Sequence, residues 1–130
     1  MKRILLIVTL ALLTTGVMSA QQKEASIAVV GDALFDFENI NEADGPATHV
    51  FKVTNEGETP LVVTKVVTSC GCTSPDWTKE PIATGKNGEI KVTFDPTGRP
   101  GPFAKTISVY SNGKSGSLVL TIKGTVVPKS

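Results

Sequence analysis

Apolar and polar residues alternate along much of the chain with a period of two, as in strands that bury one face in a sheet. The stretch "THVFKVT" at residues 48–54 places Phe51 and Val53 on one face. The stretches "EIKVTFD" at 89–95 and "SLVLTIKGTVV" at 117–127 repeat the pattern. The period predicts that the apolar set of each stretch faces a common core.

Gly, Pro and Asn interrupt this alternation at close spacing, and no helical period follows residue 20. The expected strands are 26–30, 33–37, 48–54, 60–68, 89–95, 103–110 and 117–127. Asn112-Gly113 predicts a hairpin between the last two, "NEGET" at 55–59 predicts an earlier hairpin, and "SPDWTKEP" at 74–81 is expected to be a loop. About seven short strands predict an all-β, immunoglobulin-like antiparallel β-sandwich.

The first twenty residues have the pattern of a secretory signal peptide. Lys2 and Arg3 precede an apolar run from Ile4 to Leu13, and small or tolerated residues end the segment at Ala20. The run is too short to cross a bilayer. We expect cleavage after Ala20, leaving residues 21–130 as a single exported domain without a membrane span, in the periplasm or outside the cell.

Charge adds little to this picture. The chain has 13 Lys and Arg against 12 Asp and Glu, a net charge of +1, and no run of like charge. Nothing in this balance predicts binding to nucleic acid or to an anionic membrane.

A resemblance to a known family emerges from the middle of the chain. "FKVTNEGETPLVVTKVVTSCGCTSPDW" and the segments after it resemble the bacterial domain-of-unknown-function family DUF1573 over roughly residues 33–127. The most specific elements are "SCGCT" at 69–73 and the closing Lys123-Gly124. The family is similar to Ig-like modules of the sperm-protein and ciliary-protein type. The resemblance therefore implies a module that binds partners or acts as a spacer, without an assigned activity.

Cys70 and Cys72 are the only two cysteines, and Gly71 separates them. Residues i and i+2 of a strand share a face about 6.5 Å apart, and a bend at Gly71 would bring the sulfurs within bridging range. Export permits a disulfide. The pair is a candidate disulfide, a pair of buried structural thiols, or a metal or redox site, and the sequence leaves all three open.

A metal site would need more ligands, since zinc sites use about four. His49 is the single histidine. If 55–59 closes a hairpin, His49 pairs near Thr64, about 20 Å from Cys70, and is more simply a surface strand residue. Two thiolates alone could hold a soft ion such as Cu(I). We expect Trp77 to pack over Gly71; exposed, it would instead form a binding surface with Cys70, Gly71 and Cys72.

No arrangement of a histidine, a nucleophile and a carboxylate is visible, so we expect no catalytic residues, no cofactor and no enzyme. The favoured function is a non-catalytic interaction or structural module of the cell envelope, whose partners are other envelope proteins. The alternative is a small thiol protein that handles copper or oxidants through Cys70 and Cys72.

Overall fold

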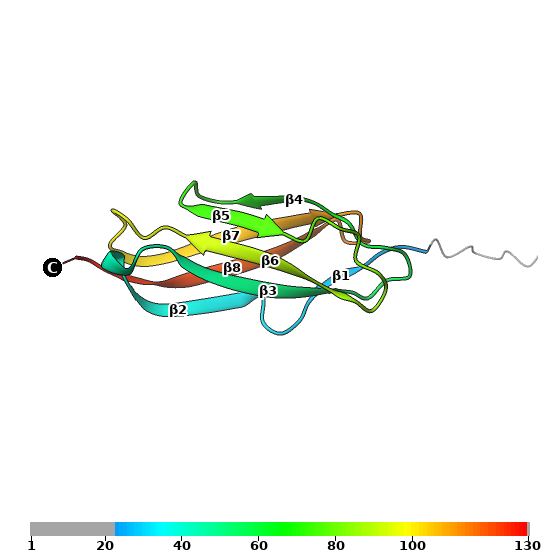
Figure 1. Cartoon of the computed structure of the whole chain (residues 1–130), viewed down its shortest axis with the longest axis horizontal. Coiled ribbons are helices and arrows are strands. Elements are labelled where there is room, and N and C mark those ends of the chain that lie inside the picture. Colours follow the sequence, from blue (N-terminus) through cyan, green and yellow to red (C-terminus); the bar gives the residue numbers. More distant parts are fainter. Residues whose placement is uncertain (1–22, 130) are drawn as a thin grey trace, which may run out of the picture.

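Two four-stranded β-sheets pack face to face in the computed structural model, which describes residues 23–129 (Figure 1). Sheet A has the strand order β1-β3-β6-β5, and sheet B has the order β2-β8-β7-β4. The strands are β1 (Ile27–Val29), β2 (Leu34–Asn41), β3 (Ala47–Asn55), β4 (Val63–Thr68), β5 (Thr73–Trp77), β6 (Asn87–Phe94), β7 (Gly101–Ser111) and β8 (Ser117–Val127). The one helical turn among these residues is the 3-10 segment η1 (Glu42–Asp44). The predicted all-β sandwich is confirmed. One pairing departs from the expected antiparallel arrangement, because β2 reaches sheet B by a crossing from sheet A and runs parallel to β8.

The expected signal peptide lies outside the described residues. Within residues 23–129, no helix has the length and hydropathy needed to cross a membrane.

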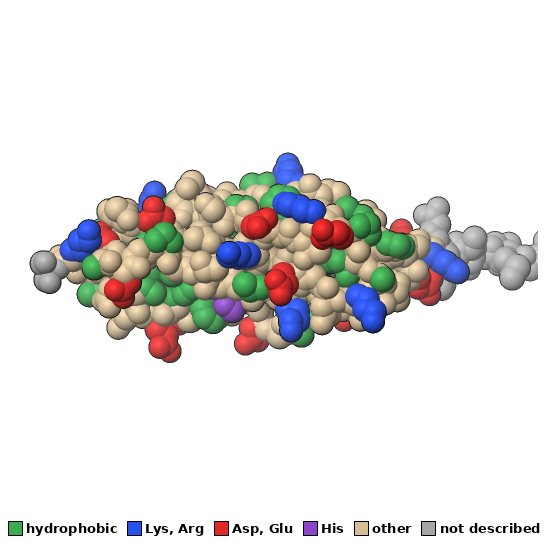
Figure 2. Space-filling model, in the orientation of Figure 1, with side chains coloured by type: hydrophobic (Ala, Val, Ile, Leu, Met, Phe, Trp, Pro, Cys, Tyr) green, Lys and Arg blue, Asp and Glu red, His purple; other side chains and the backbone are tan. Residues whose placement is uncertain are grey.

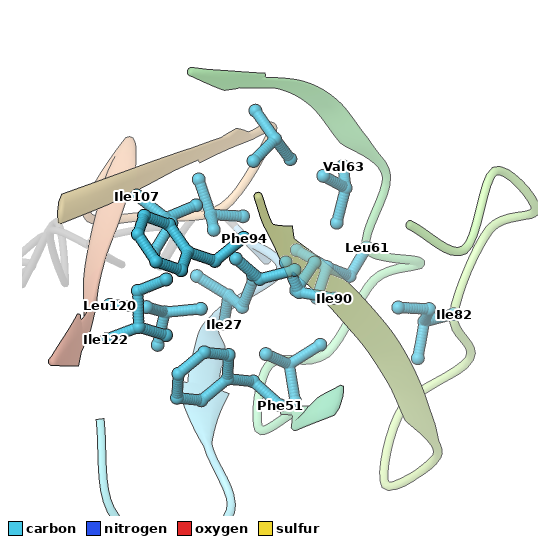
Figure 3. Packing of buried hydrophobic residues seen from close by; sticks show 14 of the residues in the cluster. Ile27, Phe51, Leu61, Val63, Ile82, Ile90, Phe94, Ile107, Leu120 and Ile122 are labelled. Atoms are coloured by element: carbon cyan, nitrogen blue, oxygen red, sulfur yellow. The ribbon is translucent and has the colours of Figure 1, made fainter. Parts of the chain in front are cut away.

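The core lies between the two sheets and is built from the residues that the alternation assigned inward. Phe51, Val53 and Phe94 are at most 2% exposed, and Figure 3 shows Phe94 facing the side chains of Ile107 and Leu120 from sheet B. Three aliphatic residues of β6 and β8 complete this layer with no exposure, namely Ile90, Val92 and Ile122. Period-two alternation was therefore a reliable guide to the inward faces.

One expectation about secondary structure is wrong: residues 74–77 of the expected loop belong to a strand, β5 (Thr73–Trp77). β5 pairs antiparallel with β6, from Thr73 opposite Phe94 to Trp77 opposite Ile90. Ser, Pro and Asp are typical of loops, but an edge strand tolerates them because one of its sides makes no ladder bonds. The described chain consequently has eight strands where about seven were expected.

The predicted hairpin at residues 55–59 is also wrong. β3 and β4 lie in different sheets, and β3 pairs instead with β6, so that His49 lies opposite Val92 and not near Thr64. The physical reason is Asn55, which has no exposed surface.

The Asn55 side chain holds three segments together. Its Oδ1 accepts from the backbone N–H groups of Ser26 at 3.3 Å and Gly57 at 2.9 Å. Its Nδ2 donates to the carbonyls of Thr59 at 2.7 Å and Ile82 at 2.9 Å. Four bonds satisfy this buried amide, and they fold residues 55–59 around it as a crossing between sheets.

The second predicted hairpin is confirmed, because β7 and β8 pair antiparallel from Gly101 opposite Val126 to Tyr110 opposite Ser117. The connection is longer than a two-residue turn, and its positive φ of 75° is at Gly116, outside the Asn112-Gly113 pair.

Candidate functional site

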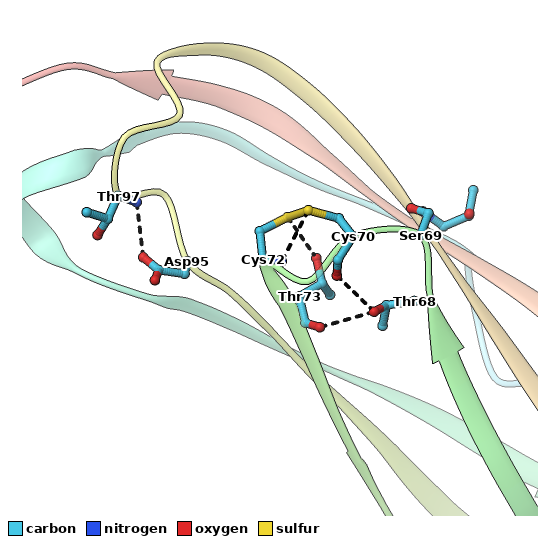
Figure 4. The surroundings of a disulfide bond; sticks show 8 residues. Thr68, Ser69, Cys70, Cys72, Thr73, Asp95 and Thr97 are labelled. Carbon is cyan, nitrogen blue, oxygen red and sulfur yellow. Dashed lines mark hydrogen bonds between the residues drawn. A yellow bond between two sulfur atoms is a disulfide. The ribbon is translucent and has the colours of Figure 1, made fainter.

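The two cysteines lie where the chain passes from one sheet to the other. β4 ends at Thr68 in sheet B and β5 begins at Thr73 in sheet A, and residues 69–72, here called the Cys corner, connect them (Figure 4). A disulfide joins Cys70 to Cys72, whose Cα atoms are 5.1 Å apart. Gly71 is exposed, and a Cβ built on it would meet nothing within 4 Å. Neither its φ nor its surroundings therefore require glycine.

Hydrogen bonds surround this disulfide. Thr73 donates its backbone N–H to the carbonyl of Cys70 at 3.1 Å. The Thr68 hydroxyl lies 3.0 Å from that same carbonyl and 3.1 Å from the carbonyl of Thr73, so its single proton is shared between them. The Cys72 backbone N–H points to the Cys70 sulfur at 3.1 Å. The Thr68 hydroxyl therefore ties the end of β4 to the start of β5, and the disulfide closes the turn between the two strands.

The two cysteines differ in exposure. Cys72 is 5% exposed and belongs to the core, whereas Cys70 is half-buried. Thiol–disulfide exchange requires a thiolate to reach a sulfur, so attack from solvent would take place at Cys70. Cys72 would be the leaving thiol, inside the fold.

Asp95 is the carboxylate connected most directly to the Cys corner. Its backbone N–H donates to the carbonyl of Cys72 at 2.9 Å. Its carboxylate accepts from the backbone N–H of Thr97 at 3.0 Å, and this hydrogen bond lowers the pKa of Asp95 (Figure 4). The carboxylate is thus anionic at neutral pH.

The Cys pair and His49 are far apart. His49 lies opposite Val92, and Val92 lies opposite Pro75, so two strand spacings separate His49 from β5, about 10 Å. Cys72 is three residues further along, about another 10 Å. In the part of the chain that the structure describes, no group of three or more His, Cys, Asp or Glu side chains could hold a metal ion.

Trp77 is at the opposite end of β5 from the Cys corner. It is half-buried against the core, and the Lys79 ammonium lies 3.0 Å from the centroid of its ring. Because the space beside Gly71 is empty, the expected packing of Trp77 over Gly71 is wrong. The structure brings Cys70, Gly71 and Cys72 together and leaves Trp77 about 16 Å away, five residues at strand rise.

The free edge of β5 offers no backbone donor. Just before and just after β5, Cys72 accepts from Asp95 N–H and Thr78 donates to the Glu89 carbonyl. By the alternation of an antiparallel ladder, the even-numbered residues of β5 therefore direct their backbone N–H and C=O groups to β6. The odd-numbered residues therefore face outward. Thr73 N–H is bonded to Cys70, Pro75 has no N–H, and Trp77 N–H is bonded to its neighbour Asp76 at 2.9 Å. This edge is closed to an incoming strand.

An aromatic cluster that was not predicted from the sequence lies on the other side of the sandwich. The rings of Phe35 on β2 and His49 on β3 are stacked, with centroids 3.6 Å apart and planes at 9°. Phe51 meets His49 edge-on at 4.6 Å, and Phe37 meets Phe35 edge-on at 4.9 Å. Burial lowers the pKa of His49, so its ring is neutral at pH 7 and acts as one more aromatic group. The signal in the sequence that could have predicted this cluster was the odd-numbered alternation that places residues 35, 37, 49 and 51 on inward faces.

Comparison with known families gives one match over most of the chain. The family model described as "Protein of unknown function (DUF1573)" matches residues 28–126. None of the curated proteins compared with the chain matches it significantly.

Several solved structures resemble the fold. A protein of unknown function from Porphyromonas gingivalis has a TM-score of 0.66 and 16% identity, over 79% of this chain and 47% of that one. The Vibrio cholerae VesB protease has a TM-score of 0.58 and 18% identity, over 79% of this chain and 31% of that one. The YadV chaperone has a TM-score of 0.53 and 15% identity, over 81% of this chain and 53% of that one. The chain spans about half or less of each, and at these identities the likeness concerns the fold alone.

Proposed function

Because the chain belongs to the DUF1573 family, which has no assigned function, we propose that it is a non-catalytic Ig-like module that is exported and binds other proteins of the bacterial cell envelope. The outer face of sheet B is the observation that carries this proposal. Val67 on β4 lies beside Ser108 on β7, and Ser108 lies beside Val119 on β8. Val67 is 43% exposed and Val119 is 53% exposed.

The cross-strand pairs on either side of Ser108 and Val119 on this face are uncharged. Thr106 pairs with Thr121, and Tyr110, 40% exposed, pairs with Ser117. The first charge on the β4 side is Lys65, whose ammonium lies 5.3 Å from the centroid of the Tyr110 ring. Val and Tyr with a rim of hydroxyl groups form the kind of surface that protein interfaces use.

Photo-crosslinking in the producing bacterium tests this function. A photoreactive phenylalanine analogue at Val119 should give a discrete higher-mass adduct, whereas the same analogue at Glu89, which is exposed on the outer face of sheet A, should give none. The absence of an adduct from Val119, or identical adducts from both positions, would contradict the proposal. Intact mass of the periplasmic protein tests export in the same cells, with the mass of residues 21–130 expected.

The partial exposure of Cys70 favours a second candidate, a thiol protein. A dithiol of a partner would pass two electrons and two protons to the Cys70–Cys72 disulfide and would itself become a disulfide. The reduced pair could hold Cu(I) between two thiolates. Thiol labelling and metal analysis of protein purified from the periplasm test this function: free thiols or stoichiometric copper support it, and a fully oxidised, metal-free pair argues against it.

A further inference from the structure

The N-terminal part of β3 pairs with β6 on one side and has no paired strand on the other side. β1 pairs with β3 only from Ile27 opposite Asn55 to Val29 opposite Val53, and the last bond runs from Val30 N–H to the Lys52 carbonyl at 2.8 Å. At Gly31, with a φ of 87°, the chain turns away and continues as β2 in sheet B, parallel to β8. Figure 1 shows this connection as the blue-to-cyan loop between β1 and β2, which moves away from β3.

The hydrogen-bond pattern shows which groups of β3 are left free. Asn55 N–H donates to the Lys86 carbonyl at 3.1 Å, so the odd-numbered residues of β3 face β6. Thr48 and Val50 therefore direct their backbone N–H and C=O groups to the opposite side. No hydrogen bond found within residues 23–129 reaches that side of either residue, because no strand pairs there. We call Thr48 to Val50 the open edge.

The open edge borders a cleft of about 300 Å³ between β3 and β2. The stacked rings of Phe35 and His49 line it together with Phe51, Leu34 and Val30. In Figure 2 the His49 side chain, in purple, reaches the surface beside hydrophobic side chains. The cleft therefore offers an apolar wall beside a row of unpaired backbone groups.

Asp32 and Lys52 also line the cleft, and both side chains are exposed. The two ion pairs found within residues 23–129 involve other residues, so Asp32 has a free carboxylate at the end of the cleft where β1 leaves β3. A strand antiparallel to β3 would enter at this end with its N-terminal side.

We propose that the open edge binds an extended segment of a partner protein, which continues sheet A where β1 leaves it. This inference rests on the proposed interaction function but uses a different surface. The central residue of the segment pairs with Val50 through its N–H and C=O groups, in the mode of strand addition. The residues on either side of it point inward to the Phe35–His49 stack and are apolar, since strand side chains alternate. A basic residue before them pairs with Asp32.

Three other edge strands, β5, β2 and β4, are less suited to such a segment. β5 has no free backbone donor on its outer side. β2 is interrupted by a register shift between Asp36 and Asn39, with Glu38 at a φ of 60°, and a bulge of this kind turns an edge away from a new partner. β4 also has a register shift, between Val63 and Lys65, and is tied to β5 at Thr68.

A matched pair of variants at Val50 tests the proposal. Val50→Pro removes the outward N–H without removing any ladder bond to β6, and proline is tolerated on an edge strand at such a position. Val50→Ala keeps the N–H and removes the side chain. A displayed library of random dodecapeptides, selected against the purified chain, is the probe.

We expect enriched peptides that alternate apolar and polar residues and carry a basic residue on the N-terminal side. Their affinity should fall about tenfold for Val50→Pro, the equivalent of one lost hydrogen bond, and should change less than about threefold for Val50→Ala. Asp32→Asn should weaken binding a few-fold at low salt. Equal affinity for both Val50 variants, or no enriched peptide, would overturn the proposal.

Amide hydrogen exchange on the unchanged protein provides a measurement that does not depend on a variant folding. Bound peptide should slow exchange at Thr48 and Val50, and unchanged exchange at both would refute strand addition. An adduct from position 119 together with no protection of the open edge would leave the interaction function standing and exclude this site alone.

Discussion

The two long sides of the sandwich deal with their sheet edges in different ways. On the side of β4 and β5, the Cys corner, the Thr68 hydroxyl and the local bonds of β5 connect the sheets and use the backbone donors of β5. On the side of β2 and β3, stacked rings cover the core, while backbone groups of β3 have no partner. The difference teaches that a covered core and a closed edge are separate properties, since side chains provide the first and backbone groups the second.

The largest effect is expected where the aromatic side meets the core. Phe51→Ala should lower the free energy of unfolding by about 3–5 kcal/mol, because Phe51 is only 2% exposed and its loss leaves a cavity. Denaturant unfolding measures this. Val50→Ala, on the same strand with 42% exposure, is the control and should change stability by less than about 0.5 kcal/mol. A loss below about 1 kcal/mol for Phe51→Ala would mean that this side is not anchored in the core.

Removal of the stacking partner should have the next largest effect. Phe35→Ala should cost about 2 kcal/mol, since Phe35 is half-buried and loses contacts with both His49 and Phe37. Thermal unfolding measures this loss of stability, and Leu34→Ala, a substitution at the exposed neighbouring residue, is the control. Equal losses for the two variants would show that the stack does not cover the core.

Removal of the disulfide on the closed side should cost less than its covalent nature suggests. Cys70→Ser combined with Cys72→Ser should lower stability by less than about 2 kcal/mol, because the bridge spans one residue and restricts the unfolded chain little. Most of the loss should come from packing of the buried Cys72. Unfolding of the double variant in buffer would show instead that the bridge is essential to the fold.

The hydroxyl link on the same side should contribute a smaller amount. Thr68→Val keeps the shape of the side chain and removes the proton shared between the carbonyls of Cys70 and Thr73, at a cost of about 1 kcal/mol. Thr64→Val, at an exposed position in β4, is the control. Equal stability of the two variants in chemical denaturation would exclude a role for this link.

The smallest effect concerns pH. Burial lowers the pKa of His49 below its ordinary value of about 6.5, so the unfolded chain binds more protons than the folded chain below that pH. Stability should therefore decrease as the pH falls from about 6.5 toward the lowered pKa of His49. Unfolding measured between pH 8 and 5 should show this slope, and His49→Phe should abolish it. A slope that persists in the variant would assign the effect to other groups.

The sequence predicted burial correctly where the inward face of a strand follows from the alternation of its own residues. The inward faces of β6 and β8 followed from alternation at Ile90, Val92 and Leu120. Pairing between strands was harder to predict, because "NEGET" has the composition of a hairpin loop and nothing local shows that Asn55 is buried. The strand at residues 74–77 was missed for a related reason, since Ser, Pro and Asp suit a loop and an edge strand equally well.

The candidate site divides in the same way. The Cys pair was visible as a motif, and its place at the end of the 60–68 stretch matches the end of β4. The open edge was not visible, because it results from where β1 leaves sheet A. The identities of Thr48 and Val50 do not indicate that the neighbouring strand, β1, stops at Val29.

The parallel pairing of β2 with β8 has a mechanical consequence. The first and the last described residues lie at opposite ends of the long axis, and β2 and β8 run side by side along it (Figure 1). Tension applied between these ends would act first on the short ladder between β1 and β3, because β1 precedes β2 in the chain. Once that ladder opened, the tension would pull β2 and β8 past each other, so that force acts along the strands and across their hydrogen bonds. The bonds of the ladder would then resist together, and rupture would require several of them to break at once. Unzipping a hairpin breaks such bonds one after another, so this arrangement favours resistance to stretching along the axis.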